Sequence, residues 1–201
     1  QLGALLDQLE RRGLLSNTLV VVTSDHGEEF GEHGWVNHGN GLYLPALRVP
    51  LVISFPGHIP EGAVVEDPIT LRDLPATVLD LVAAGNQKSI PGNSLSWRWS
   101  PLADSTRMTV SPVLSEVRSA RNGPSWYAVA RGDMQSIVIQ RHHYIRNGDG
   151  REELFDIVAD PWETVDLAKT QTGKGMLVSA RAALDSATRS SARKVPTDKT
   201  H

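Results

Sequence analysis

Residues 18–39 read TLVVVTSDHGEEFGEHGWVNHG, so an apolar run passes directly into a polar loop rich in glycine. The four aliphatic residues 19–22 follow a stretch with helical periodicity, and this combination predicts a strand buried on both faces. In α/β proteins the carboxyl end of such a strand is where ligands bind. Asp25 and His26 fall at that end.

Asp25 and His26 carry side chains that can act as metal ligands, one through oxygen and one through nitrogen. Adjacent side chains leaving a strand diverge unless the backbone bends, and Gly27 permits a bend. Two further histidines, His33 and His38, follow in the same loop. A surface loop with inactive histidines is the simpler interpretation, but loops at this edge of a sheet commonly carry sites. We therefore treat Asp25 and His26 as candidate site residues.

Five short motifs follow one another along the chain. They are TSDHG at 23–27, GEHG at 31–34, HGNGLY at 38–43, LRVPL at 47–51 and ELFDIVADPWE at 153–163, the last followed by VDL at 165–167. Together they resemble the C-terminal half of a sulfatase of the alkaline phosphatase superfamily. The resemblance covers roughly residues 1–168, and it is the combination of motifs that makes it specific.

The resemblance implies metal-dependent hydrolysis of sulfate esters. In the family an Asp-His pair at this place binds a divalent cation, so Asp25 and His26 are the expected ligands. Ca²⁺ is the expected ion, with Mg²⁺ or Mn²⁺ as alternatives. His38 stands where the family usually has a lysine that contacts a sulfate oxygen and assists the leaving group, so we expect it to be catalytic. His33, His38 and Asn40 are expected to bind the substrate.

No residue of the chain can be assigned as the nucleophile. In the family this group is a formylglycine made from Cys or Ser, with Pro and Arg two and four residues later. The sequence has no Cys, and no Ser has that spacing. Because the chain also opens on Gln1 and runs directly into a helical pattern, we expect a C-terminal portion of a longer sulfatase. Alone, this portion is expected to bind metal weakly and to be inactive.

Two other functions stay open. A phosphodiesterase, a phosphonate monoester hydrolase or a phosphoethanolamine-type transferase of the same superfamily would use the same Asp-His pair. Alternatively, the chain is an inactive structural or interaction module. A stable fold whose melting does not respond to metal would favour this module.

The expected partners are a sulfate-ester small molecule or glycan, together with an N-terminal half of the same protein or a second copy of the chain. A net charge of −3 gives no basic excess for binding nucleic acid. No apolar run is long enough to span a bilayer. The sequence does not indicate a location, although the resemblance is in keeping with an exported or membrane-anchored protein.

The patterning predicts an α/β fold in three parts. Residues 1–107 are expected to form the C-terminal part of a sulfatase core, a mostly parallel sheet flanked by helices, with helices at 2–12 and 74–84 and strands at 18–23 and 49–55. Residues 108–190 are expected to form a small antiparallel sheet, with strands at 113–117, 126–130, 136–140, 143–145 and 154–157 and a closing helix at 176–187. Residues 191–201 are expected to be a disordered tail.

Overall fold

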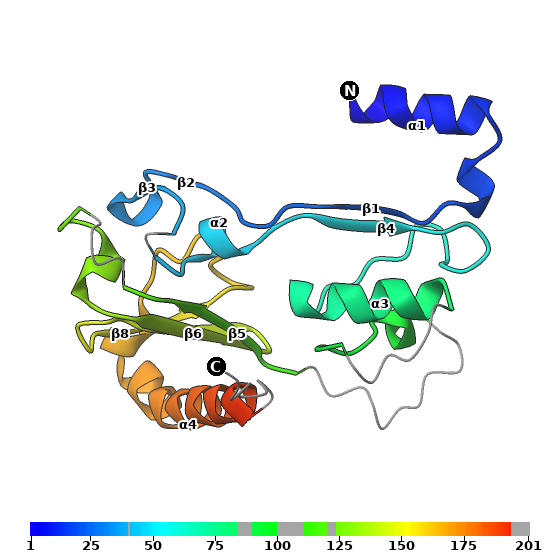
Figure 1. The fold of residues 1–201 in the computed structure, drawn as a ribbon. Helices are drawn as coiled ribbons and strands as arrows, with labels where there is room; N and C mark the ends of the chain where they lie inside the picture. The colour runs from blue at the N-terminus through cyan, green and yellow to red at the C-terminus, as the bar shows by residue number, and fades with distance from the viewer. Residues whose placement is uncertain (40, 84–89, 100–110, 120–123, 194–201) are drawn as a thin grey trace, which may run out of the picture. The chain divides into compact units, whose positions relative to one another are not determined.

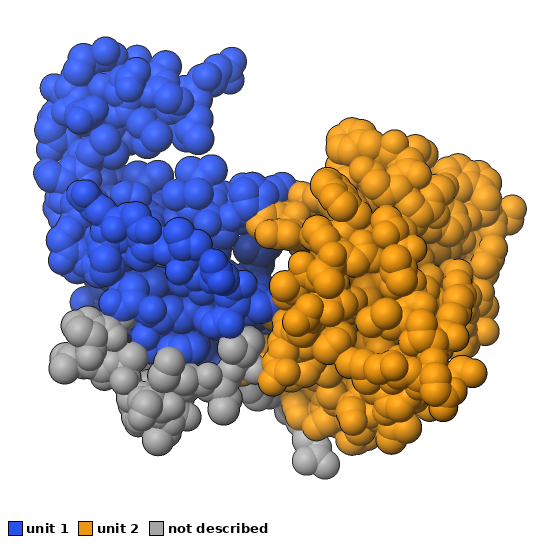
Figure 2. All heavy atoms as spheres, turned by 180° about the vertical axis from the view of Figure 1, so that it is seen from behind, with its two compact units in different colours: residues 1–24, 50–110 blue, residues 25–49, 111–201 orange. Residues whose placement is uncertain are grey.

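The structure is a computed structural model that describes residues 1–39, 41–83, 90–99, 111–119 and 124–193 (Figure 1). The chain divides into two compact units, which Figure 2 colours separately. Unit 1 comprises Gln1–Ser24 and Pro50–Val110, and unit 2 comprises Asp25–Val49 and Ser111–His201. The sequence analysis placed residues 25–49 with residues 1–107, whereas the structure has them in unit 2.

Unit 1 combines helices with one pair of strands. Its helices are α1 (Leu2–Arg11) and α3 (Leu74–Leu81). Strand β1 (Val20–Thr23) pairs with β4 (Leu51–Ser54), and the pairing is antiparallel. A mostly parallel sheet was expected here, so this pair differs from the prediction. A parallel pair needs a crossover that returns the chain to the other end of the strand, usually a helix packed on the sheet. Residues 25–49 instead belong to unit 2, and their helix, α2 (Leu44–Leu47), has only 4 residues.

The burial of β1 also differs from the prediction. Its three valines are half-buried and Thr23 is exposed, where a strand buried on both faces was expected. Among the described residues, β4 is the strand that pairs with β1. A paired strand covers only an edge of β1, whereas its faces are buried only where other elements pack on the sheet. Helix α1 has no buried residue, in keeping with the partial burial of β1.

Unit 2 is built on a four-stranded antiparallel sheet with strand order β5-β6-β7-β8. The strands are β5 (Val113–Val117), β6 (Met134–Ile139), β7 (His142–Arg146) and β8 (Glu152–Asp156). Helix α4 (Gln171–Arg193) packs on one face, where Leu177, Ala180 and Leu184 contact apolar side chains of the sheet (Figure 1). The predicted α/β class is confirmed, and so is an antiparallel sheet closed by a helix.

Two predicted elements of unit 2 were wrong in detail. Residues 126–130 do not form a strand, because Ala128–Arg131 is a 3-10 turn that buries Ala128 and Val129. An apolar run this short has no period long enough to separate a strand from a turn. Helix α4 extends beyond the predicted 176–187 and includes residues 191–193 of the predicted tail. The remaining tail residues lie outside the described part of the chain.

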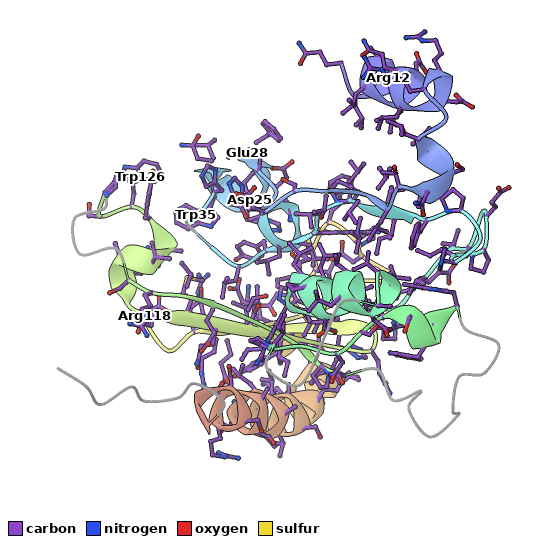
Figure 3. The ribbon with its side chains drawn as sticks, turned by 45° about the vertical axis from the view of Figure 1, so that its right-hand side comes forward. Arg12, Asp25, Glu28, Trp35, Arg118 and Trp126 are labelled. Carbon is purple, nitrogen blue, oxygen red and sulfur yellow. The ribbon has the colours of Figure 1, made fainter. Side chains whose placement is uncertain are left out.

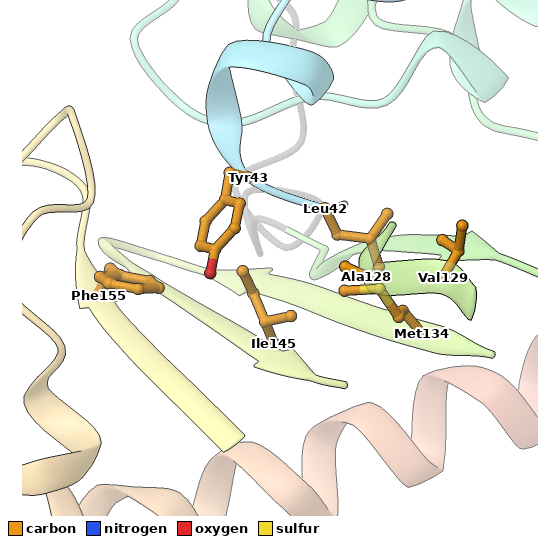
Figure 4. Packing of buried hydrophobic residues seen from close by; sticks show 7 residues of the cluster. All are labelled: Leu42, Tyr43, Ala128, Val129, Met134, Ile145 and Phe155. Atoms are coloured by element: carbon orange, nitrogen blue, oxygen red, sulfur yellow. The ribbon is translucent and has the colours of Figure 1, made fainter. Parts of the chain in front are cut away.

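The other face of this sheet is covered by residues that follow the candidate site loop. Leu42 and Tyr43 pack there against a buried cluster from the strands and the 3-10 turn (Figure 4). The cluster consists of Ala128, Val129, Met134, Ile145 and Phe155. The sheet of unit 2 therefore supports the loop through its core. None of the described helices is both apolar enough and long enough to cross a membrane.

Candidate active site

A short hairpin carries two of the candidate side chains. Strand β2 (Glu29–Phe30) pairs antiparallel with β3 (Val36–Asn37). Extending this register by one pair sets Glu28 opposite His38, and Nδ1 of His38 lies 3.1 Å from a carboxylate oxygen of Glu28. A carboxylate accepts, so His38 donates from Nδ1. Glu28 thus orients the ring that the sequence analysis singled out as catalytic.

Gly27 lies where the loop backbone meets α2. Its N–H donates to the carbonyl oxygen of Ala46 at 2.8 Å. A Cβ built on Gly27 would lie 2.0 Å from the carbonyl oxygen of Pro45, so no other residue fits without moving the backbone. The sequence analysis explained this glycine by a bend. The structure gives close approach as the reason.

His26 is held in an orientation that suits a metal ligand. Its Nδ1 lies 2.8 Å from the carbonyl oxygen of Gly27. A carbonyl can only accept, so Nδ1 carries the proton and Nε2 of the neutral ring carries the lone pair. Metal-binding histidines commonly donate their second N–H to a carbonyl in this way. Nε2 lies 3.8 Å from Oδ2 of Asp25, so both atoms are placed to reach one cation.

A second set of possible metal ligands shares His26 with this pair. His26, Glu28 and His38 each offer one ligand atom, and these atoms all lie within 4.8 Å of one another. The rings of His26 and His38 stack with their centroids 3.9 Å apart (the surrounding loop is shown in Figure 3). The sequence analysis did not select Glu28. What marks Glu28 as a site residue is its position opposite His38, and this position follows from the pairing of β2 with β3.

His33 lies in contact with a late segment of the chain. Its Nε2 is within hydrogen-bond distance of the carbonyl oxygens of Trp162, at 3.1 Å, and Glu163, at 3.2 Å. Its ring stacks on Tyr43 with centroids 3.8 Å apart. The structure therefore brings Asp25, His26 and His38 together, whereas His33 contacts Tyr43 and the backbone of residues 162–163. Asn40 lies outside the described residues.

Glu29 occupies the opposite face of the hairpin from Glu28, as alternation along a strand requires. It is 2 % exposed, and neither carboxylate oxygen has a hydrogen-bond partner among the described residues. Burial raises the pKa of Glu29 to about 7, and the charges of three nearby glutamates, Glu32, Glu163 and Glu28, add to the shift. The carboxyl group therefore keeps its proton well above the usual range for glutamate.

The fold is mixed α/β, and imidazole and carboxylate groups gather on one of its loops. Such groups can hold a divalent cation, and a cation held in this way can act on charged esters. The sequence model of the sulfatase family matches residues 1–84. The chain is therefore similar to the sulfatase family over these residues, which confirms the resemblance seen in its motifs.

Two curated relatives show how far the similarity extends. The arylsulfatase of Clostridium perfringens is 29% identical over 177 residues, which cover 87% of this chain and 34% of that protein. The N-acetylglucosamine-6-O-sulfatase of Bacteroides thetaiotaomicron is 31% identical over 170 residues, covering 83% of this chain and 27% of the relative. The chain therefore spans about a third of the length of these relatives.

A solved structure agrees with this assignment. It was determined in complex with its substrate D-glucosamine-2-N,6-O-disulfate, and it superposes on this chain with a TM-score of 0.80 and 25% sequence identity. The similarity covers 98% of this chain and 39% of that one.

Proposed function

We propose that the protein containing this chain hydrolyses sulfate esters, and that the chain supplies part of a cation site and one group that contacts the sulfate. The similarity to the sulfatase family supports the reaction. The observation that carries the assignment of residues is the convergence of Asp25 and His26, whose Oδ2 and Nε2 lie 3.8 Å apart.

The roles follow from what the reaction requires. Hydrolysis of a sulfate ester needs charge neutralised on the non-bridging oxygens, a nucleophile placed in line, and a proton for the leaving oxygen. A bound divalent cation would supply the neutralisation, and Asp25 and His26 are the residues that would hold it. His38 would contact a sulfate oxygen and assist the leaving group, with Glu28 holding its ring.

Ca²⁺ is the proposed ion, with Mg²⁺ or Mn²⁺ as alternatives. Ca²⁺ takes six to eight oxygen ligands, and the pair formed by Asp25 and His26 offers few of these. We therefore propose that further ligands, and the formylglycine nucleophile, come from a part of the protein outside these 201 residues. On this proposal the chain alone binds the cation weakly and does not turn over substrate.

The proposed substrate is a sulfated small molecule or glycan. The relatives are named as sulfatases of aryl and amino-sugar esters, and the solved structure holds a sulfated glucosamine. Esters of phosphate are the competing substrate class. A sulfate ester, a phosphodiester and a phosphonate monoester each carry one negative charge at neutral pH, so a direct comparison of rates with the same leaving group is needed to separate the classes.

We expect Asp25→Asn and His38→Ala to lower kcat/KM of the complete protein for 4-nitrophenyl sulfate by about 100-fold or more, the range typical of losing a metal ligand or a positioned acid. The measurement is steady-state release of 4-nitrophenol. His142→Ala is the matched control, since it removes an imidazole from β7, outside the loop. Unchanged activity in Asp25→Asn would refute the assignment. Faster release from bis(4-nitrophenyl) phosphate or 4-nitrophenyl phenylphosphonate would favour a phosphodiesterase or a phosphonate monoester hydrolase.

Cation binding should also stabilise the chain. A ligand that binds only the folded state at ten times its Kd adds about 1.4 kcal/mol to the free energy of unfolding. We expect titration with Ca²⁺ to raise the melting temperature of the chain, and we expect Asp25→Asn to remove most of this rise. No response in the unmodified chain would favour the structural module, and an equal response in Asp25→Asn would place the ion elsewhere.

A further inference from the structure

We propose that Glu163, in the late segment of unit 2, is a positioning residue for the candidate active site. It holds α2 in place, and α2 holds the backbone beside His26. The proposal rests on the function proposed for that site. Nothing in the roles described so far uses Glu163, although it lies in the last of the five motifs.

The carboxylate of Glu163 is buried and fully engaged. The residue is 2 % exposed. One carboxylate oxygen accepts the backbone N–H of Leu44 at 2.6 Å, and the other accepts Nδ1–H of His143, a side chain with no exposed surface. A buried carboxylate is tolerated when donors compensate it in this way. The two donors come from α2 and β7, so one side chain ties both elements together.

The contacts continue from α2 to the candidate site. Leu44 is the first residue of α2, and its N–H is one that the helix itself cannot satisfy. Two residues later, the carbonyl oxygen of Ala46 accepts the N–H of Gly27 at 2.8 Å. Gly27 is bonded to His26 and Glu28. A displacement of α2 would therefore move His26 and Glu28. Because Glu28 accepts the hydrogen bond of His38, the ring of His38 would lose its position as well.

The backbone of the same segment holds the hairpin at its turn. The carbonyl oxygens of Trp162 and Glu163 accept from Nε2 of His33, in the 3-10 turn Glu32–Gly34 that joins β2 to β3. Glu163 adopts φ 56, a left-handed conformation that is costly for a residue with a side chain. Such a conformation persists only where its surroundings determine it. The backbone of Glu163 thus contacts the turn of the hairpin, and its side chain acts through α2 on the base of the same hairpin.

The test compares Glu163→Gln with Leu184→Ala in the complete protein. Glutamine keeps the size of the side chain, but it removes the charge and turns one acceptor into a donor. Leu184, on α4, is fully buried against the sheet, in a cluster whose described members include no residue of the loop. Its truncation leaves a cavity in the core and lowers stability, so it reports what lost stability alone does to activity.

We expect Glu163→Gln to lower kcat/KM for 4-nitrophenyl sulfate at least tenfold and to weaken Mn²⁺ binding by calorimetry to a similar extent. Leu184→Ala should stay within about twofold of the unmodified protein in both. All proteins are assayed well below their melting temperatures, as followed by circular dichroism. Loss of less than twofold in Glu163→Gln, or equal loss in Leu184→Ala, would overturn the proposal.

A second variant covers the case in which Glu163→Gln does not fold. Glu163→Asp keeps the charge but shortens the side chain by one methylene, so it cannot hold Leu44 and His143 together, and the same losses are expected. The imidazole NMR signals of His26 and His38 give a readout that needs no turnover. If the unmodified protein does not hydrolyse sulfate, the proposed function fails, whereas unshifted signals in both Glu163 variants would refute the positioning role alone.

Discussion

Replacing Gly27 by alanine should destabilise the protein by about 3 kcal/mol and abolish its response to Ca²⁺. The added Cβ would lie 2.0 Å from the carbonyl oxygen of Pro45, less than the distance at which carbon and oxygen can approach. The obstacle is backbone, so it cannot rotate away as a side chain would. The loop and α2 must separate, which adds the loss of the Gly27–Ala46 hydrogen bond to the cost of overpacking.

Chemical denaturation of Gly27→Ala measures the loss of stability, and thermal melting with and without Ca²⁺ measures the loss of binding. Gly175→Ala is the matched control, because Gly175 lies within α4 and a Cβ there meets nothing within 4 Å. The control should gain about 0.5–1 kcal/mol, since alanine favours a helix. If Gly27→Ala also gained stability, the explanation that close approach of α2 requires a glycine at this position would be refuted.

Replacing Glu29 by glutamine should stabilise the protein at alkaline pH and leave it nearly unchanged in acid. Burial raises the pKa of Glu29 to about 7, with the charges of Glu32, Glu163 and Glu28 adding to the shift. The folded state therefore favours the protonated acid. This contribution to stability is present below the pKa of the unfolded chain, near 4.5, and is lost as the pH rises through 7. Above pH 7 the folded protein must bury a charge.

The measurement is the free energy of unfolding at pH 5 and pH 8. Between these values the advantage of Glu29→Gln over the unmodified protein should grow by roughly 2–3 kcal/mol, in proportion to the pKa difference. Asp149→Asn is the control, since that carboxylate accepts the N–H of Arg151 and its pKa is lowered, first by this backbone hydrogen bond. Its effect should be the same at both pH values. A constant effect of Glu29→Gln would show that Glu29 is ionised throughout.

Elements with a sustained pattern could be predicted, and short ones could not. The strand at 113–117 is observed with the predicted bounds, and the closing helix is found at the predicted place. Strands β2 and β3 have two residues each, too few for alternation to be seen among glycines. The hairpin was therefore missed, and with it the pairing of Glu28 with His38.

By itself, the sequence determined the resemblance to a family, the longer helices, most of the longer strands, and the neighbourhood of Asp25 and His26. These depend on the order of residues along a few turns or one strand, where covalent geometry limits the outcome. Only the tertiary structure decided that Gly27 must have no side chain and that Glu163 meets Leu44, 119 residues away. Contacts over such separations follow from how the core packs, which no local pattern encodes.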